Sequence, residues 1–259
     1  MRLTVQCLRL QILGRYLAMM LGFGLLAGLC ILWAPWASAL LLLRRPKEPW
    51  NRRGRRVIRM GFRAYLETLK FLKFIEIDLL EFSCQDLTKP MLLAPNHPSL
   101  LDALLLLAYG PDLICVMKSD LFAHPLLGPG ARLAGYISNR RPRRMIVDAI
   151  QALENGHSIL LFPEGTRTPG NLLGELKQSP AVIAQRSGCD IQTVLIEINS
   201  GFLGKNWHWR QPPVLPLRVR LRLGPRLKPN PDIRQMTRDL RACYFEAKES
   251  AAEPFGCVA

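Results

Sequence analysis

The chain has 259 residues, 49% of them hydrophobic, and a formal net charge of +15 at pH 7. Its length fits one globular domain with an appendage, and its charge predicts a polyanionic partner: nucleic acid, an acidic membrane surface or a phosphorylated substrate. The sequence has no HExxH motif, no zinc-ligand spacing and no Walker phosphate loop, which argues against a zinc enzyme and a P-loop enzyme. We expect no metal site.

The positive charge is concentrated near the N-terminus. Residues 1–56 hold ten Lys and Arg side chains against one acid, Glu48, which is +9 of the total of +15. These residues flank the most apolar run of the chain. A membrane is therefore the favoured partner, and we expect no nucleic-acid partner.

Residues 16–43 contain no charged side chain. As a straight helix this run would be about 42 Å long, against about 30 Å for the hydrocarbon core of a bilayer. Pro35 is predicted to interrupt it, so a kinked span and a shallow helical hairpin both fit. A cleaved signal peptide is the rival, but the run is longer than a signal core and arginines follow it. These arginines predict that the rest of the chain lies on the cytoplasmic face, at the inner membrane in a bacterium.

Residues 57–74 alternate apolar and basic side chains at helical spacing. An interfacial helix on anionic lipid is the favoured interpretation, and a helix packed on the domain is the alternative. We therefore expect two parts: residues 1–74 form a membrane anchor with an interfacial helix, and residues 75–259 form the catalytic domain.

Beyond residue 74, strand-like and helix-like runs alternate. Strands are predicted at residues 75–82, 91–94, 113–117, 136–138, 158–162, 191–198 and 217–223, and helices at 99–108, 121–133, 145–154, 179–186 and 231–248. This succession predicts an α/β fold with a mostly parallel, mixed sheet flanked by helices. Ligands of such sheets bind beyond the carboxyl ends of the strands.

His97 and Asp102 lie where a predicted strand passes into a predicted helix. Pro98 fits the first helical position, and the residue before a proline avoids helical dihedrals. His97 can therefore fold back over the first helical turn and meet the Asp102 carboxylate. That pair is suited to general-base chemistry, because the carboxylate orients one ring nitrogen and leaves the other to accept a proton.

Two further loops follow strand-like runs, Gly135 to Arg140 and Phe162 to Arg167. Arginine is suited to bidentate phosphate binding, and Gly165 lets the backbone approach a ligand. The residues alone thus predict a proton-abstracting site beside a phosphate pocket at a membrane surface.

The motifs NHPSLLD (96–102), GYISNR (135–140) and FPEGTR (162–167) resemble, in order and spacing, those of the glycerolipid acyltransferases, the lysophosphatidic-acid acyltransferase family. The resemblance implies that His97 deprotonates an acceptor hydroxyl and that Asp102 orients it. It implies acyl-CoA or acyl carrier protein as the acyl donor, membrane lipids as partners, and neither a cofactor nor a covalent acyl-enzyme. The expected substrate-binding residues are Asn96, Gly135, Arg140, Glu164, Gly165, Thr166 and Arg167.

One departure concerns the fourth motif of this family, which usually carries a proline in a strand; residues 191–198 have none and include Glu197. The acceptor head group therefore stays open. The sequence also does not give the acyl chain length or the oligomeric state. The alternatives are a phospholipid transacylase that needs no thioester donor and a non-catalytic lipid-binding membrane protein.

Overall fold

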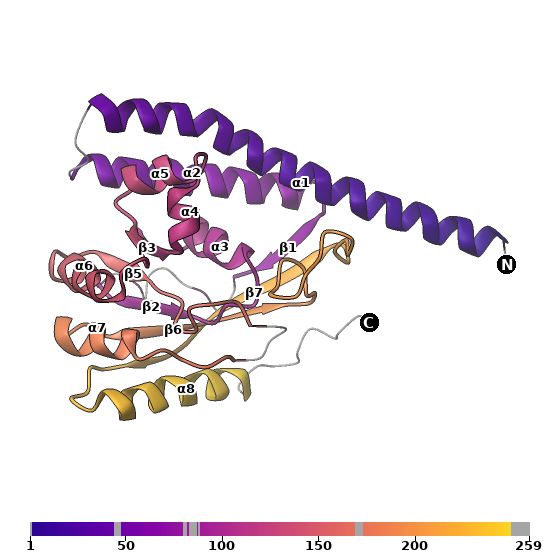
Figure 1. Ribbon diagram of the computed structural model, residues 1–259. Helices are drawn as coiled ribbons and strands as arrows, with labels where there is room; N and C mark the ends of the chain where they lie inside the picture. The colour runs from indigo at the N-terminus through magenta and orange to yellow at the C-terminus, as the bar shows by residue number, and fades with distance from the viewer. Residues whose placement is uncertain are drawn as a thin grey trace.

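A single sheet organises the domain (Figure 1). In the computed structural model, which describes residues 2–43, 48–79, 82, 87, 89–168 and 173–249, seven strands lie in the order β1-β7-β6-β2-β5-β3-β4. All neighbouring strands are parallel except β6 and β7, which are antiparallel. The predicted mostly parallel α/β fold is confirmed. The strands are β1 Ile75–Asp78, β2 Leu92–Pro95, β3 Leu113–Met117, β4 Ile137–Ser138, β5 Ser158–Leu160, β6 Ile191–Ile198 and β7 Leu217–Leu227.

Helices cover both faces of the sheet. On one face, α2 and α3 pack against the strands, with α1 lying over them; α6, α7 and α8 cover the opposite face (Figure 1). Each face has its own buried apolar cluster, as expected for a sheet enclosed between helical layers. The helices are α1 Arg2–Leu43, α2 Trp50–Phe71, α3 Leu101–Tyr109, α4 Ser119–Ala123, α5 Gly128–Leu133, α6 Pro142–Glu154, α7 Ser179–Ser187 and α8 Ile233–Glu249.

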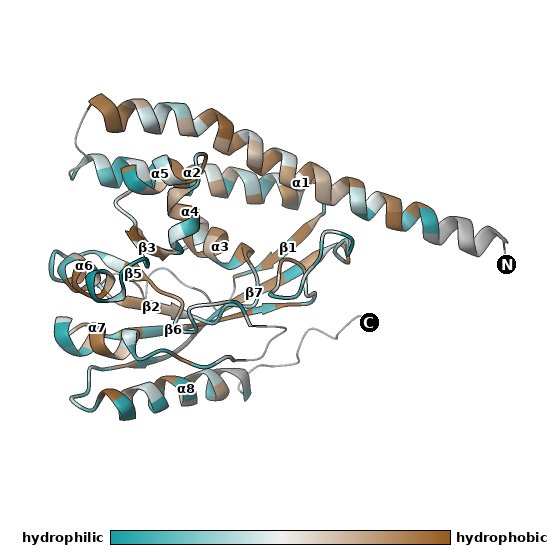
Figure 2. Ribbon diagram, viewed as in Figure 1, coloured by the Kyte–Doolittle hydropathy of each residue, from teal (hydrophilic) through white to brown (hydrophobic). Residues whose placement is uncertain are grey.

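The N-terminal helix α1 runs without a break through Pro35. The prediction that Pro35 interrupts the apolar run is therefore wrong; proline removes one backbone hydrogen bond, but its fixed φ is helical, and a long helix can tolerate it. Within the described residues, α1 is the one helix long and apolar enough to cross a membrane. Its outer surface is mostly apolar and uncovered (Figure 2).

Several predicted boundaries shift for local reasons. The helix predicted over residues 121–133 is two short helices, α4 and α5, because Pro125 lies between them. Helix α3 begins at Leu101 rather than at Pro98, and in the turn before it the Ser99 hydroxyl accepts a hydrogen bond from the Leu101 N–H at 3.2 Å. Strand β1 ends at Asp78, and the predicted end of that strand includes residues 80 and 81, which lie outside the described residues.

Helix α2 packs closely on the domain. Its side chains Tyr65, Leu66 and Leu69 are buried in the same apolar cluster as α3. At its N-terminal end the Arg55 guanidinium bonds to both Asp112 carboxylate oxygens, at 2.7 and 3.0 Å. The inner face of α2 thus fits the alternative interpretation, a helix packed on the domain, while Met60 and Phe71 are exposed on its outer face.

Two glycines in α2 allow a matched test of this packing. A Cβ at Gly54 would lie 2.9 Å from the Leu133 carbonyl oxygen and 3.0 Å from the Ala134 nitrogen, whereas a Cβ at Gly61 meets no atom within 4 Å. Because backbone cannot move aside cheaply, we expect Gly54→Ala to destabilise the protein by about 1–3 kcal/mol. Gly61→Ala should instead stabilise it, by up to about 1 kcal/mol. Thermal unfolding in detergent measures both, and equal shifts would contradict the close approach of α2.

Candidate active site

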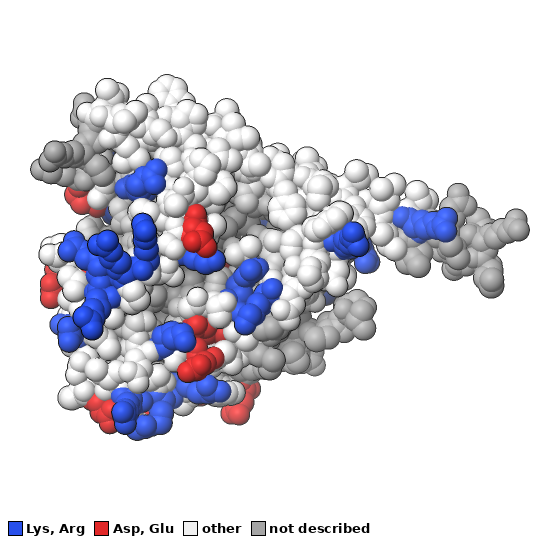
Figure 3. All heavy atoms as spheres, viewed as in Figure 1, with Lys and Arg blue, Asp and Glu red and all other residues white. Residues whose placement is uncertain are grey.

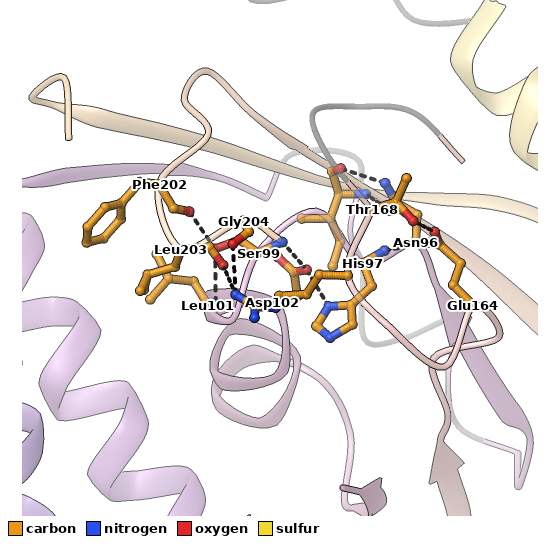
Figure 4. Close-up of polar contacts among 12 residues, drawn as sticks. Asn96, His97, Ser99, Leu101, Asp102, Glu164, Thr168, Phe202, Leu203 and Gly204 are labelled. Carbon is orange, nitrogen blue, oxygen red and sulfur yellow. Dashed lines mark hydrogen bonds and ion pairs between the residues drawn. The ribbon is translucent and has the colours of Figure 1, made fainter. Parts of the chain in front are cut away.

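The His97 imidazole meets the Asp102 carboxylate, as the spacing predicts. His97 Nδ1 lies 2.8 Å from Asp102 Oδ2, and the two side chains are 15% and 0% exposed (Figure 4). His97 belongs to the turn after β2, while Asp102 lies in the first turn of α3. Negative charge is favourable there, because the helix N-terminus carries a partial positive charge.

The Asp102 carboxylate is held by two donors and enclosed by protein. The Ser99 N–H donates to the same oxygen, Oδ2, at 2.8 Å, while Oδ1 is buried and has no partner among the described residues. Burial raises the pKa of Asp102 to about 6, and the hydrogen bonds from His97 and the Ser99 N–H partly offset this effect. A change of pH near 6 therefore alters the charge of the group that orients His97.

Aromatic stacking and hydrogen bonding fix the His97 ring. It stacks on the Phe162 ring, with centroids 4.0 Å apart and an interplanar angle of 27°. Since an ionised Asp102 accepts from Nδ1, that nitrogen carries the proton, and Nε2 presents a lone pair. Nε2 has no hydrogen-bond partner in the part of the chain that the structure describes. This is the arrangement of an oriented base.

The Glu164 side chain holds the backbone of His97. It is only 2% exposed, and its Oε1 accepts the His97 N–H at 2.9 Å. Its Oε2 accepts the Gly174 N–H at 2.8 Å and the Thr168 hydroxyl, and the Thr168 N–H donates back to the His97 carbonyl at 2.9 Å. Glu164, expected to bind substrate, is thus fully engaged within the protein.

Asn96 is also engaged internally. Its side chain bridges β6, donating to the Ile196 carbonyl at 3.0 Å and accepting the Ile196 N–H at 2.7 Å. It therefore ties residues 96–100, the turn that carries His97 and is called the catalytic turn below, to the neighbouring strand. Its place beside His97 did not reveal this positioning role.

The Arg167 guanidinium contacts the loop after β6. Its Nη1 donates to the carbonyls of Leu203 and Gly204, at 2.7 and 2.9 Å. The neighbouring Gly165 has φ +68°, a conformation that favours glycine, and Thr166 is exposed. These three residues lie in the loop that follows β5, the strand next to β2, and so remain near His97.

Gly135 and Arg140 lie away from His97, at the edge of the sheet. Three strand spacings, about 14 Å, separate β2 from the edge strand β4 that these residues flank. Both line a groove of about 680 Å³ along α6 that does not include His97. The structure thus divides the expected phosphate-binding residues between the catalytic turn and the sheet edge. No group of three or more His, Cys, Asp or Glu in the described ranges is arranged to hold a metal ion.

Glu197, the departure from the fourth motif, faces away from the catalytic turn. Val194, Ile196 and Ile198 pack on the face of α2 and α3, so alternation along β6 directs Glu197 to the opposite face. There it is buried and accepts a hydrogen bond from Arg222 at 3.2 Å.

The sequence did not predict that the loop between β6 and β7 contacts the turn that carries His97. The Ser99 hydroxyl donates to the Phe202 carbonyl at 3.0 Å, and the Leu100 N–H donates to the Leu203 carbonyl at 3.2 Å. Backbone carbonyls leave no trace in a sequence pattern. In the sequence, only the aromatic residues of this loop indicated that it could have a role beyond that of a connection.

The fold and this pair define an α/β domain built around an oriented histidine, and comparisons with known proteins give its family. Residues 75–197 match the family described as Acyltransferase. A 1-acyl-sn-glycerol-3-phosphate acyltransferase of Helicobacter pylori is 35% identical over 44% of this chain and 50% of its own length. A lyso-ornithine lipid O-acyltransferase of Rhizobium meliloti is 35% identical over 36% of this chain and 34% of its own length. Residues 75–197 therefore form a domain of the Acyltransferase family, and the curated relatives that this chain matches are glycerolipid and ornithine-lipid acyltransferases.

A solved structure shows the same fold. The 1-acyl-sn-glycerophosphate acyltransferase PlsC of Thermotoga maritima aligns over 95% of this chain and 99% of its own, with a TM-score of 0.71 and 18% identity. The chloroplast relative LPAT1 of Arabidopsis thaliana is 28% identical over 41% of this chain. The chain spans about a third of the length of the Arabidopsis and Rhizobium relatives.

Removal of the Glu164 carboxylate should loosen the turn that carries His97. Glu164→Ala leaves the His97 and Gly174 N–H groups without their partner, and we expect a loss of about 2–4 kcal/mol in the free energy of unfolding. Glu175→Ala is the control, because that side chain is exposed, and it should change stability by less than about 0.5 kcal/mol. Equal unfolding midpoints for the two variants would contradict the positioning role.

Proposed function

We propose that this protein is a membrane-associated O-acyltransferase that moves a fatty acyl chain from a thioester to the hydroxyl group of a lysolipid. The observation that carries the proposal is the buried Asp102 carboxylate, 2.8 Å from Nδ1 of a histidine whose Nε2 has no partner among the described residues. The match of residues 75–197 to the Acyltransferase family supports the same reaction class.

In the proposed reaction, His97 Nε2 removes the proton from the acceptor hydroxyl while the oxygen attacks the thioester carbonyl. The carbon–sulfur bond then breaks, and the leaving thiolate takes the proton from the imidazolium. Asp102 stabilises the imidazolium that forms in between. Every proton and electron pair is accounted for by the two substrates and His97, so the scheme needs neither a metal nor a covalent acyl-enzyme.

The acceptor is a lysolipid with one free hydroxyl, as the names of the relatives suggest. Those relatives act on 1-acyl-glycerol-3-phosphate in one group and on lyso-ornithine lipid in the other. For the donor, we propose acyl-CoA or acyl carrier protein. Gly165, Thr166 and Arg167, beside the catalytic turn, are the proposed acceptor contacts, and Arg140 and Gly135 at the sheet edge serve the more distant parts of the substrates.

We also propose that α1 lies in one leaflet rather than across the bilayer. It packs along the domain, with Gly22 beside Tyr65 and Leu69 of α2, and Trp33 against Gly130 of α5. Because α1 is packed lengthwise on the domain, it could cross the bilayer only if part of the domain entered the bilayer as well. Its outer surface carries little charge (Figure 3) and is suited to hydrocarbon. The basic residues after α1 favour the cytoplasmic face.

Replacement of the base tests the mechanism. We expect His97→Ala to lower the rate of acyl transfer by about 10²–10⁴-fold, because no other group takes the hydroxyl proton. The assay uses the purified full chain in detergent with acyl-CoA or acyl carrier protein and a set of lysolipids, with products identified by mass spectrometry. His124→Ala, at an exposed histidine, is the control and should keep its activity. Full turnover by His97→Ala would refute the mechanism, and turnover without a thioester would indicate a transacylase.

The pH dependence tests the role of Asp102. Because burial raises its pKa to about 6, the carboxylate protonates as the pH falls through this value, and kcat/KM should decline below it. In Asp102→Asn, kcat/KM should be low throughout, and the part of the decline due to Asp102 should disappear. An unchanged acid limb in this variant would assign the decline to another group.

The raised pKa of Asp102 also predicts how the free energy of unfolding depends on pH. The native state binds this proton more tightly than an unfolded chain, whose carboxyl has the ordinary pKa of 3.8. The contribution of Asp102 to the free energy of unfolding is therefore largest below pH 4 and is lost as the pH rises through about 6.

A further inference from the structure

The loop of residues 199–216, between β6 and β7, has a composition unlike that of an ordinary surface loop. It contains no acidic residue, two basic residues and three large aromatic residues: Lys205, Arg210, Phe202, Trp207 and Trp209. The Trp209 side chain is 65% exposed. Exposed tryptophan next to basic side chains is typical of segments that lie in the headgroup region of a membrane.

On one side this loop contacts the apolar helix α1 (Figure 1). The Phe23 ring lies 6.1 Å from both the Phe202 and Trp207 rings, which meet edge to face at 5.2 Å. The Tyr16 hydroxyl donates to the Arg210 carbonyl. Tyr16 and Phe23 are seven residues apart, on the same side of α1, so the loop follows the helix for about 10 Å. Tyr16 is the first residue of the uncharged run of α1, which follows Arg15.

On its other side the loop holds the catalytic turn. Carbonyls of three consecutive residues, Phe202, Leu203 and Gly204, accept hydrogen bonds from Ser99, Leu100 and Arg167 (Figure 4). Ser99 in turn donates its N–H to Asp102. An unbroken series of contacts thus runs from α1 through the loop to the carboxylate that orients His97.

We propose that residues 199–216 form a second membrane-contact element, which docks on the headgroup layer of an anionic bilayer beside α1 and holds the catalytic turn at that surface. The inference rests on the membrane placement of α1 proposed above. Trp209 and Arg210 provide the contact, since both side chains are exposed and project from a loop that is fixed on both flanks. A lysolipid then meets the catalytic turn without leaving the bilayer surface.

The opposite side of the molecule offers a matched control. On α8, which lies on the far side of the sheet from α1, Arg241 lies over the ring of Phe245 with a separation of 5.7 Å, and Phe245 is 48% exposed. On the loop, Arg210 lies over Trp209 with a separation of 5.4 Å. The two pairs thus have similar chemistry and exposure, and only the loop pair lies beside α1.

The first test measures contact directly. The full chain is reconstituted in vesicles of phosphatidylglycerol and phosphatidylcholine brominated near the headgroup, and the share of tryptophan emission that bromine quenches is compared with that of Trp209→Phe. If Trp209 lies in the interface, removing it lowers the quenched share. If it lies in water or against another protein, removing it raises the quenched share, and the inference is overturned.

The second test measures the consequence for activity. We expect Trp209→Ser with Arg210→Ser to raise the apparent KM for a vesicle-borne lysolipid about tenfold, and to leave kcat for a short-chain, water-soluble acceptor within about twofold. Arg241→Ser with Phe245→Ser should change neither value. Equal KM values for the two double variants would overturn the docking role. An inactive parent protein would instead refute the proposed function, and the quenching result would still decide this inference.

Discussion

A carboxylate removed from water must be stabilised by the groups around it, and Asp102 is where this requirement is most severe. The side chain is fully buried, and both of its hydrogen bonds, from His97 and from the Ser99 N–H, go to one oxygen. Burial raises its pKa, so the negative charge is maintained only while these donors stay in place. The His97 ring is consequently fixed in one orientation: any rotation that breaks its bond to Asp102 leaves a buried charge with a single partner. The orientation that suits a general base is thus also the one that the buried charge stabilises.

The backbone around this pair is held from both sides by segments that are distant in sequence. Residues after β5, Glu164 and Thr168, bind the N–H and carbonyl of His97, while the loop after β6 binds Ser99 and Leu100. These connections are short because β2 lies between β5 and β6 in the sheet, so the carboxyl ends of all three strands meet at one edge. The strand order of the sheet therefore fixes His97, because it places the loops after β5 and β6 on either side of the turn that follows β2.

The sequence predicted those features of the fold and site that depend on residues close together in the chain, and it did not predict those that depend on distant residues. The strands over residues 113–117 and 191–198 were predicted with their observed bounds, because continuous apolar runs report burial on both faces. The meeting of His97 and Asp102 was also predictable, since it depends on one local turn. The roles of Asn96 and Glu164 were not, because their partners are 100 and 67 residues away. The separation of Arg140 from Arg167 depends on strand order, which no local pattern encodes. The start of α3 was misplaced because Ser99 forms a local turn ahead of the helix, which therefore begins at Leu101.

The position of the catalytic turn relative to α1 has a consequence for catalysis at a membrane. The turn leads into α3, which shares its face of the sheet with α2 and α1. Phe23 of α1 belongs to the apolar layer that packs against this face, and Phe162, on which the His97 ring stacks, packs against the same layer. The helix proposed to enter lipid and the base proposed to activate a lipid hydroxyl are therefore parts of one packed unit. Confining a lysolipid and its enzyme to the same surface removes much of the entropy cost of bringing the hydroxyl to Nε2, and holding the reactants in register can contribute more to the rate than proton abstraction does. The rigid attachment of α1 along the domain, rather than a flexible tether, is what gives this confinement a fixed geometry.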